Sequence, residues 1–198
     1  MDLSVYPFKT KPYPHQYNIL DNSWARKEFA LHCEMGLGKS RIIIDNISVL
    51  WKEQKITHAL IAAPAGVYSN WLLEFDKHLP ADVPVEIHLW KRLNSRREEG
   101  AFKSLVLGDT GALKILLINI EALSTEKGFK ASQIFLQKIS GQSAMIIDES
   151  TVIKNPSARR TKAAIKLGKM SDYRRVLSGL PTPNSPLDLY APFSFLSG

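Results

Sequence analysis

The stretch LHCEMGLGKSRIIID, residues 31–45, decides the fold. It places the tripeptide GKS, residues 38–40, after the apolar run 29–32 and before a segment with helical spacing. Glycines let successive backbone N–H groups turn toward one anion, and the start of a helix adds the positive end of its dipole. The stretch therefore indicates a phosphate-binding loop between a strand and a helix. Cys33 stands where the general pattern G-x-x-x-x-G-K-[ST] has its first glycine.

Short apolar runs alternate with longer mixed segments along the chain. The runs are rich in Ile, Leu, Val and Ala, which is typical of strands buried on both faces. We expect strands at residues 29–32, 58–63, 85–89, 113–118, 144–147 and 175–177, and helices at 40–51, 68–78, 129–139 and 157–167. The charge-dense residues 91–100 predict the exposed start of a further helix. This alternation predicts an α/β fold with a mainly parallel central sheet between two layers of helices.

A second motif, AMIIDE at residues 144–149, is an apolar strand that ends in two acids. Ligands of an open α/β sheet bind beyond the carboxyl ends of its strands, so Asp148 and Glu149 should share an edge with the loop. Lys39 would then reach the β- and γ-phosphates of ATP. Ser40 and Asp148 would hold Mg²⁺, and Glu149 would act as general base on the attacking water. The alternative is an acidic turn that runs out into solvent.

The motifs together resemble the first RecA-like lobe of a superfamily-two helicase, in the Swi/Snf branch of double-strand DNA translocases. That branch writes its phosphate loop as D-E-M-G-L-G-K-[ST] and also lacks the first glycine. Residues 34–40, EMGLGKS, match it. The resemblance implies a three-layer RecA-like P-loop NTPase domain. It also implies the following nucleotide-binding residues: Gln16, Glu34, Met35, Gly36, Leu37, Gly38, Lys39, Ser40 and Arg41.

Four other segments resemble family motifs in the same order along the chain. They are PYPHQ at 12–16, whose Gln16 would bond the adenine edge, APAGVYSNWLLEF at 63–75, INIEAL at 118–123, and LSGLP at 177–181. The acidic motif continues into IKN at 153–155. The resemblance implies DNA contacts at Pro64, Asn70, Asn119, Glu121, Lys154 and Asn155. It implies coupling between ATP and DNA at Thr151, Ser178 and Gly179.

Two departures from the family pattern concern this coupling. Ser150-Thr151 replaces Ala-His in the acidic motif, and Leu180 stands where the family usually has Thr. Thr151 and Ser178 retain the capacity to hydrogen-bond, but Leu180 does not. Phosphate chemistry is therefore better supported than its coupling to movement.

Several residues in these segments also have an ordinary structural explanation. Trp71, Leu72 and Phe75 should be buried on one face of a helix. Asn155 followed by Pro156 is a favourable start for a helix, with the asparagine as its cap. The basic residues Arg159, Arg160 and Lys162 form either a solvated face or a contact with DNA phosphates, and we slightly favour the phosphates.

Composition sets wider limits. The 198 residues carry 26 Lys and Arg against 19 Asp and Glu, a net charge of +7 that weakly favours a polyanionic partner. A single cysteine excludes an internal disulfide and fits a reducing cytoplasm. The amino terminus does not resemble a signal peptide, and no apolar stretch approaches the roughly 18 residues of a membrane helix. We therefore expect a cytoplasmic, DNA-associated protein without a membrane partner.

The resulting hypothesis is a DNA-dependent ATPase whose residues 1–198 form a single RecA-like lobe. Its cofactors are ATP and Mg²⁺, and its partner is DNA, most plausibly double-stranded. The second lobe, which supplies arginine fingers, lies outside this chain, so the isolated lobe should be weakly active. One alternative is a non-catalytic module that binds DNA or protein and has a degenerate nucleotide site. Another is the motor subunit of a restriction system. The abbreviated motifs also resemble those of phage or prophage members.

Overall fold

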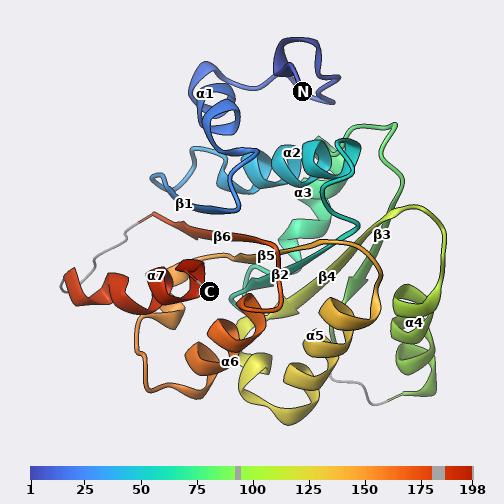
Figure 1. Cartoon of the computed structure of the whole chain (residues 1–198), viewed down its shortest axis with the longest axis vertical. Helices are drawn as coiled ribbons and strands as arrows, with labels where there is room; N and C mark the ends of the chain where they lie inside the picture. Colours follow the sequence, from blue (N-terminus) through green and yellow to red (C-terminus); the bar gives the residue numbers. More distant parts are fainter. Residues whose placement is uncertain (92–94, 180–185, 198) are drawn as a thin grey trace.

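A central parallel sheet organises the chain. The computed structural model describes residues 1–91, 95–179 and 186–197. Its six strands lie in the order β1-β6-β5-β2-β4-β3, and every pairing is parallel (Figure 1). The strands are β1 (Glu28–His32), β2 (His58–Ala63), β3 (Val85–Leu89), β4 (Leu113–Asn119), β5 (Ser143–Ile147) and β6 (Tyr173–Ser178). The structure confirms all six predicted strands, each within two residues at either end.

Helices cover both faces of the sheet, as predicted. They are α1 (Pro14–Ser23), α2 (Lys39–Lys52), α3 (Asn70–His78), α4 (Arg96–Leu107), α5 (Glu126–Lys138), α6 (Arg159–Gly168) and α7 (Tyr190–Ser197). Short 3₁₀ helices connect them: η1 (Leu3–Val5), η2 (Ile120–Ser124), η3 (Ser150–Ile153) and η4 (Pro186–Leu189). Helices α2 and α3 lie on one face with α1 outside α2, and α4 to α7 lie on the other (Figure 1). Within the described residues, no helix has the length and apolarity needed to cross a membrane.

The core has two halves, one on each side of the sheet. Ala59 and Ile61 of β2 pack with α2 and α3, whereas Leu60 and Ala62 pack with the helices of the other face. This alternation follows from the two-residue period of a strand, and each of the four side chains is fully buried. Strands β2 and β5, at the centre of the sheet, are therefore apolar after their first residues, His58 and Ser143.

Four local expectations need correction. Leu72 is 37% exposed, because α3 buries Trp71, Phe75 and His78 on its inner face. Helix α6 begins at Arg159 rather than at Ser157. Asn155 does not cap this helix, because its Oδ1 accepts hydrogen bonds from the backbone N–H and the hydroxyl of Ser157 in the preceding turn. Helix α5 begins three residues earlier than expected, because the hydroxyl of Thr125 caps it at Gly128.

Candidate nucleotide site

Topology brings the two predicted motifs to one edge of the sheet. Strand β6 lies between β1, which leads into the glycine loop, and β5, which leads into the paired acids. The backbone N–H of Cys33 donates to the carbonyl of Ser178 at 3.1 Å, so the loop starts against the end of β6. A cavity of about 650 Å³ opens at this edge. Its lining consists of Tyr13, Gln16, Met35, Gly36, Gly38, Lys39, Ser40, Arg41, Pro64, Val67, Asn70, Trp71, Glu74, Lys77, His78, Asp148 and Glu149.

The loop between β1 and α2 depends on two glycines. Gly36 and Gly38 have φ angles of 83° and 79°, a region that other residues rarely adopt. The loop then enters α2, whose first residue is Lys39. The Lys39 ammonium donates to the carbonyls of Cys33 and Glu34, at 2.9 and 3.1 Å, and so lies folded across its own loop. The arrangement has the strand, loop and helix order that a phosphate-binding site requires.

The first of the paired acids is held from an unexpected direction. The backbone N–H of Asp148 continues the pairing with β2 by donating to Ala62 at 2.8 Å. Its carboxylate Oδ2 accepts a hydrogen bond from Nε1 of Trp71 on α3 at 3.0 Å. Burial raises the pKa of Asp148 above its ordinary value, and the indole donor opposes that rise. Helical spacing correctly predicts that Trp71 is buried in the core. It does not predict the hydrogen bond from the indole N–H to Asp148.

The second acid is fixed by the next strand. Glu149 has a φ of 54°, an uncommon conformation for a non-glycine residue and one that is often found at functional sites. Its Oε1 accepts hydrogen bonds from the hydroxyls of Thr151, at 2.9 Å, and Ser178, at 3.2 Å. The hydrogen-bonding capacity expected of these two residues is thus directed at one carboxylate oxygen. Gly179 follows beside the loop, where an added Cβ would lie 3.5 Å from Met35.

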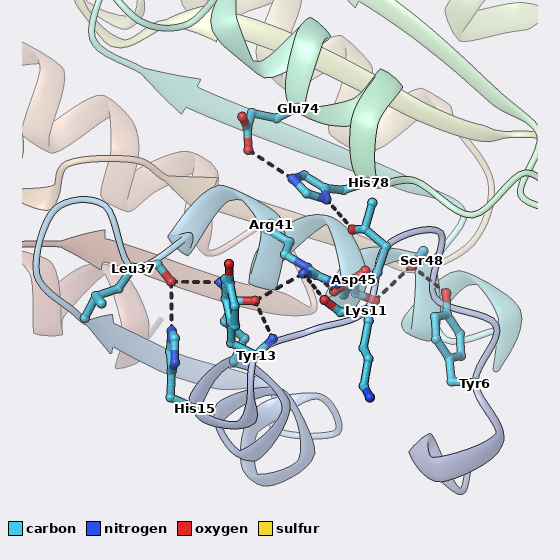
Figure 2. A network of polar contacts seen from close by, with 12 residues as sticks. Tyr6, Lys11, Tyr13, His15, Leu37, Arg41, Asp45, Ser48, Glu74 and His78 are labelled. Carbon is cyan, nitrogen blue, oxygen red and sulfur yellow. Dashed lines mark hydrogen bonds and ion pairs between the residues drawn. The ribbon is translucent and has the colours of Figure 1, made fainter.

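The amino-terminal segment contributes Tyr13 and Gln16 to the lining of the same cavity. Figure 2 shows the polar contacts of this segment with the loop and with α2. Gln16 is only 5% exposed, and its Nε2 donates to the carbonyl of Leu37 in the loop at 3.1 Å. His15 Nε2 contacts the same carbonyl at 3.2 Å. Tyr13 is exposed and stacks on His15, with the ring planes 9° apart. Arg41 lines the cavity, and its guanidinium donates to several protein acceptors.

The residues predicted to contact DNA do not form one group. Pro64 and Asn70 line the nucleotide cavity itself. Asn119 uses its side chain to cap η2, where Oδ1 accepts from the N–H of Ala122 at 2.7 Å. Glu121 and Asn155 are exposed, and Lys154 lines a separate hollow beside Glu149 and Gly179. Leu180, the departure from the family pattern, lies outside the described residues.

The chemistry of the cavity fits a nucleotide with a divalent cation. The hydroxyl of Ser40 and the carboxylate of Asp148 are hard oxygen donors on one cavity, which is the ligand type that Mg²⁺ prefers. The loop offers backbone N–H groups at a helix start, and Lys39 offers an ammonium that now holds only loop carbonyls. An anionic phosphate is therefore suited to one end of the cavity, and Tyr13 and Gln16 border the other.

Comparison with known proteins identifies relatives of the chain. The model of the SNF2-related domain matches residues 26–198. The human protein called helicase-like transcription factor is 31% identical over 144 residues, which is 73% of this chain and 13% of that protein. The ATP-dependent helicase fft3 of Schizosaccharomyces pombe is 27% identical over 188 residues, 91% of this chain and 19% of that protein.

A solved structure has a similar fold. A Sulfolobus solfataricus SWI2/SNF2 ATPase core in complex with dsDNA has a TM-score of 0.72 and 25% identity to the chain. The match covers 96% of this chain and 36% of that one. The chain therefore spans less than a fifth of the two curated relatives and about a third of the archaeal core.

Proposed function

The chain belongs to the SNF2-related domain family, and from this premise we propose that it is the ATP-binding lobe of a DNA-dependent ATPase. In this proposal, hydrolysis of ATP to ADP and phosphate is coupled to movement on duplex DNA or to its remodelling. The observation that carries it is the meeting of Lys39, Ser40, Asp148 and Glu149 on one cavity.

Each of these four residues has a role that suits its surroundings. The loop N–H groups and Lys39 would bind the β- and γ-phosphates. Ser40 and Asp148 would hold Mg²⁺, which when bound neutralises phosphate charge. Glu149 would accept a proton from the attacking water. Thr151 and Ser178 keep Oε1 of Glu149 in place, so the second oxygen is the one directed to this task.

A second RecA-like lobe, in the same protein or in a partner, would complete the motor. Arginine fingers from such a partner raise the rates of related phosphoryl-transfer enzymes by roughly 10³–10⁵. The proposal therefore assigns binding of ATP to this lobe and expects only slow hydrolysis from it alone.

DNA would bind at the same edge of the sheet. This proposal rests on the archaeal relative, which was solved with dsDNA, and on the positions of Asn119, Glu121, Lys154 and Asn155 in or beside η2 and η3. Pro64 and Asn70 line the nucleotide cavity, and they would act on DNA only through α3.

A nucleotide titration tests the proposal. The 198-residue chain should bind ATP with Mg²⁺, and Lys39→Ala should weaken this affinity by at least tenfold, since it removes a charge-assisted contact of about 1.5–3 kcal/mol. Lys52→Ala, on the same helix but outside the cavity, is the matched control. Equal affinity of the parent and the Lys39 variant would favour the alternative, a non-catalytic DNA- or protein-binding module.

A further inference from the structure

Arg41 connects two parts of the chain that are remote in sequence. It is 5% exposed, on the first turn of α2. Its Nη1 donates to the carbonyl of Lys11 at 2.8 Å and to Oε1 of Gln16 at 3.2 Å. Its Nη2 donates to the carbonyl of Thr10, and its Nε pairs with Asp45 at 3.3 Å. One guanidinium thus holds three acceptors of the segment formed by residues 10–16 (Figure 2).

This amino-terminal segment precedes the part of the chain that matches the family, which starts at residue 26. The segment also contacts the loop, since Nε2 of His15 and Nε2 of Gln16 lie 3.2 and 3.1 Å from the carbonyl of Leu37. The hydroxyl of Thr10 contacts Nδ1 of His78 at 2.7 Å, and further upstream the hydroxyl of Tyr6 contacts that of Ser48 at 2.6 Å (Figure 2).

Arg41 also fixes which way the Gln16 amide faces. Oε1 of Gln16 accepts from the backbone N–H of Tyr13, at 3.0 Å, as well as from Arg41. Both partners are obligate donors, so an amide turned the other way would point its NH₂ at two donors. The NH₂ group therefore faces the carbonyl of Leu37. Through Gln16, the guanidinium reaches the phosphate-binding loop itself.

We propose that Arg41 is a positioning residue for the base end of the nucleotide pocket. It does not touch the nucleotide but holds Tyr13 and Gln16 where they line the cavity beside the loop. A ligand with a nucleoside depends on this arrangement, whereas a bare triphosphate depends only on the loop, Lys39 and the acids. The inference rests on the proposed ATP site, and comparison of the two ligands separates it from that proposal.

The test uses the 198-residue chain with two probes, Mg-ATP and Mg-tripolyphosphate. The first variant is Arg41→Lys, which keeps a positive charge beside Asp45 but loses the fork that spans three acceptors. We expect it to weaken ATP binding about tenfold, because residues 10–16 would no longer be held in advance and would have to become ordered when the nucleoside binds. Binding of tripolyphosphate should stay within about twofold of the parent. Amide exchange at residues 10–16 should become faster while the strands stay protected.

Arg174→Lys is the matched control. Arg174 also donates to backbone carbonyls, those of Leu196, Ser171 and Gly168, and pairs with the carboxylate of Glu28. It lies outside the nucleotide cavity. The Arg174→Lys variant should have a lower unfolding temperature but an unchanged ratio of ATP affinity to tripolyphosphate affinity. Arg41→Met is a more severe change. It should lower the ratio of ATP affinity to tripolyphosphate affinity at least as far as Arg41→Lys does.

The outcomes are distinct. Unchanged ATP affinity in Arg41→Lys would overturn the inference, and so would equal weakening of both ligands. Either result would leave the phosphate site intact as long as the parent binds tripolyphosphate. Failure of the parent to bind either ligand would overturn the nucleotide site and, with it, the role of Arg41.

Discussion

Nε1 of Trp71 lies 3.0 Å from Oδ2 of Asp148 and donates a hydrogen bond to it. The two residues are far apart in sequence, on α3 and at the end of β5. The indole is 2% exposed and packs in the core, so its polar edge is held rigidly against the carboxylate. A side chain from the core thereby orients the group that we assign to Mg²⁺.

Trp71→Phe should weaken binding of Mg-ATP while keeping the fold. Phenylalanine retains most of the buried ring but removes the only donor that the described side chains give to Asp148. The pKa of Asp148, already raised by burial, should rise further, and the requirement for Mg²⁺ should increase several-fold. Titration of ATP binding against Mg²⁺ concentration measures this. The control is Trp51→Phe, near the carboxyl end of α2, which should leave the Mg²⁺ requirement unchanged. An unchanged requirement in Trp71→Phe would contradict the role of Trp71 in orienting Asp148.

Removing either hydroxyl that holds Glu149 should slow hydrolysis. Thr151→Ala and Ser178→Ala each remove a hydrogen bond worth about 1 kcal/mol, which corresponds to roughly fivefold in rate. Both hydroxyls donate to Oε1, so their effects should be coupled. The rise in the activation free energy of the double variant should therefore differ from the sum of the rises in the two single variants. Single-turnover hydrolysis with excess protein is the suitable measurement for a slow lobe. The control is Ser194→Ala, whose hydroxyl donates to the carbonyl of Tyr190 on α7, outside the cavity. Strict additivity, or a loss equal to that of this control, would argue against the arrangement.

The two loop glycines should differ when replaced. Gly36→Ala and Gly38→Ala both place an L-residue at a positive φ, which costs about 1–2 kcal/mol. A Cβ at Gly38 would in addition lie 2.4 Å from Nε2 of Gln16, whereas at Gly36 no atom lies within 4 Å. Gly38→Ala should therefore lower the unfolding temperature and ATP affinity more than Gly36→Ala. Equal effects would mean that Gln16 can move aside freely.

Buried His58 should make stability depend on pH. Burial lowers its pKa to about 4 from an ordinary value of 6.5, since the ring is fully buried between Thr57 and the carbonyl of Leu136. The unfolded chain then binds the extra proton between pH 6.5 and 4, so this contribution to stability is lost as the pH falls through that window, by about 3 kcal/mol in total.

The measurement is the free energy of unfolding of the parent and of His58→Gln across this range. Asp45 acts in the opposite sense, because burial raises its pKa to about 7 and the folded state then binds the extra proton. The difference in slope between the two proteins isolates His58, and the variant should depend less steeply on pH. Parallel curves would contradict the assignment.

Helix α6 should contribute phosphate contacts to DNA. No acidic residue occurs between Glu149 and Asp172, and Arg159 and Lys162 are exposed one turn apart on α6. Replacing both with Ala should weaken DNA binding and reduce the slope of log affinity against log salt by about 2. The pair Lys55→Ala and Lys138→Ala, at the opposite edge of the sheet, is the matched control. An equal change of slope in both pairs would show that only net charge matters.

The sequence by itself determined the strands, their parallel arrangement and the identity of the two motifs. Apolar runs and glycine positions are local signals, and a parallel sheet requires its connections to return to the same edge. The local signal was weaker where side-chain packing decided the outcome, as for Leu72, which the helical spacing placed in the core. It also failed at Asn155, whose side chain closes a turn instead of capping α6.

Only the tertiary structure decided which side chains hold the functional groups. The order β1-β6-β5 sets Ser178 beside Glu149, and the packing of α3 sets Trp71 against Asp148. The tertiary structure also decided that the guanidinium of Arg41, which lines the cavity, binds residues 10–16. These contacts join segments many residues apart, and a hydrogen bond depends on distances and angles that no local pattern encodes.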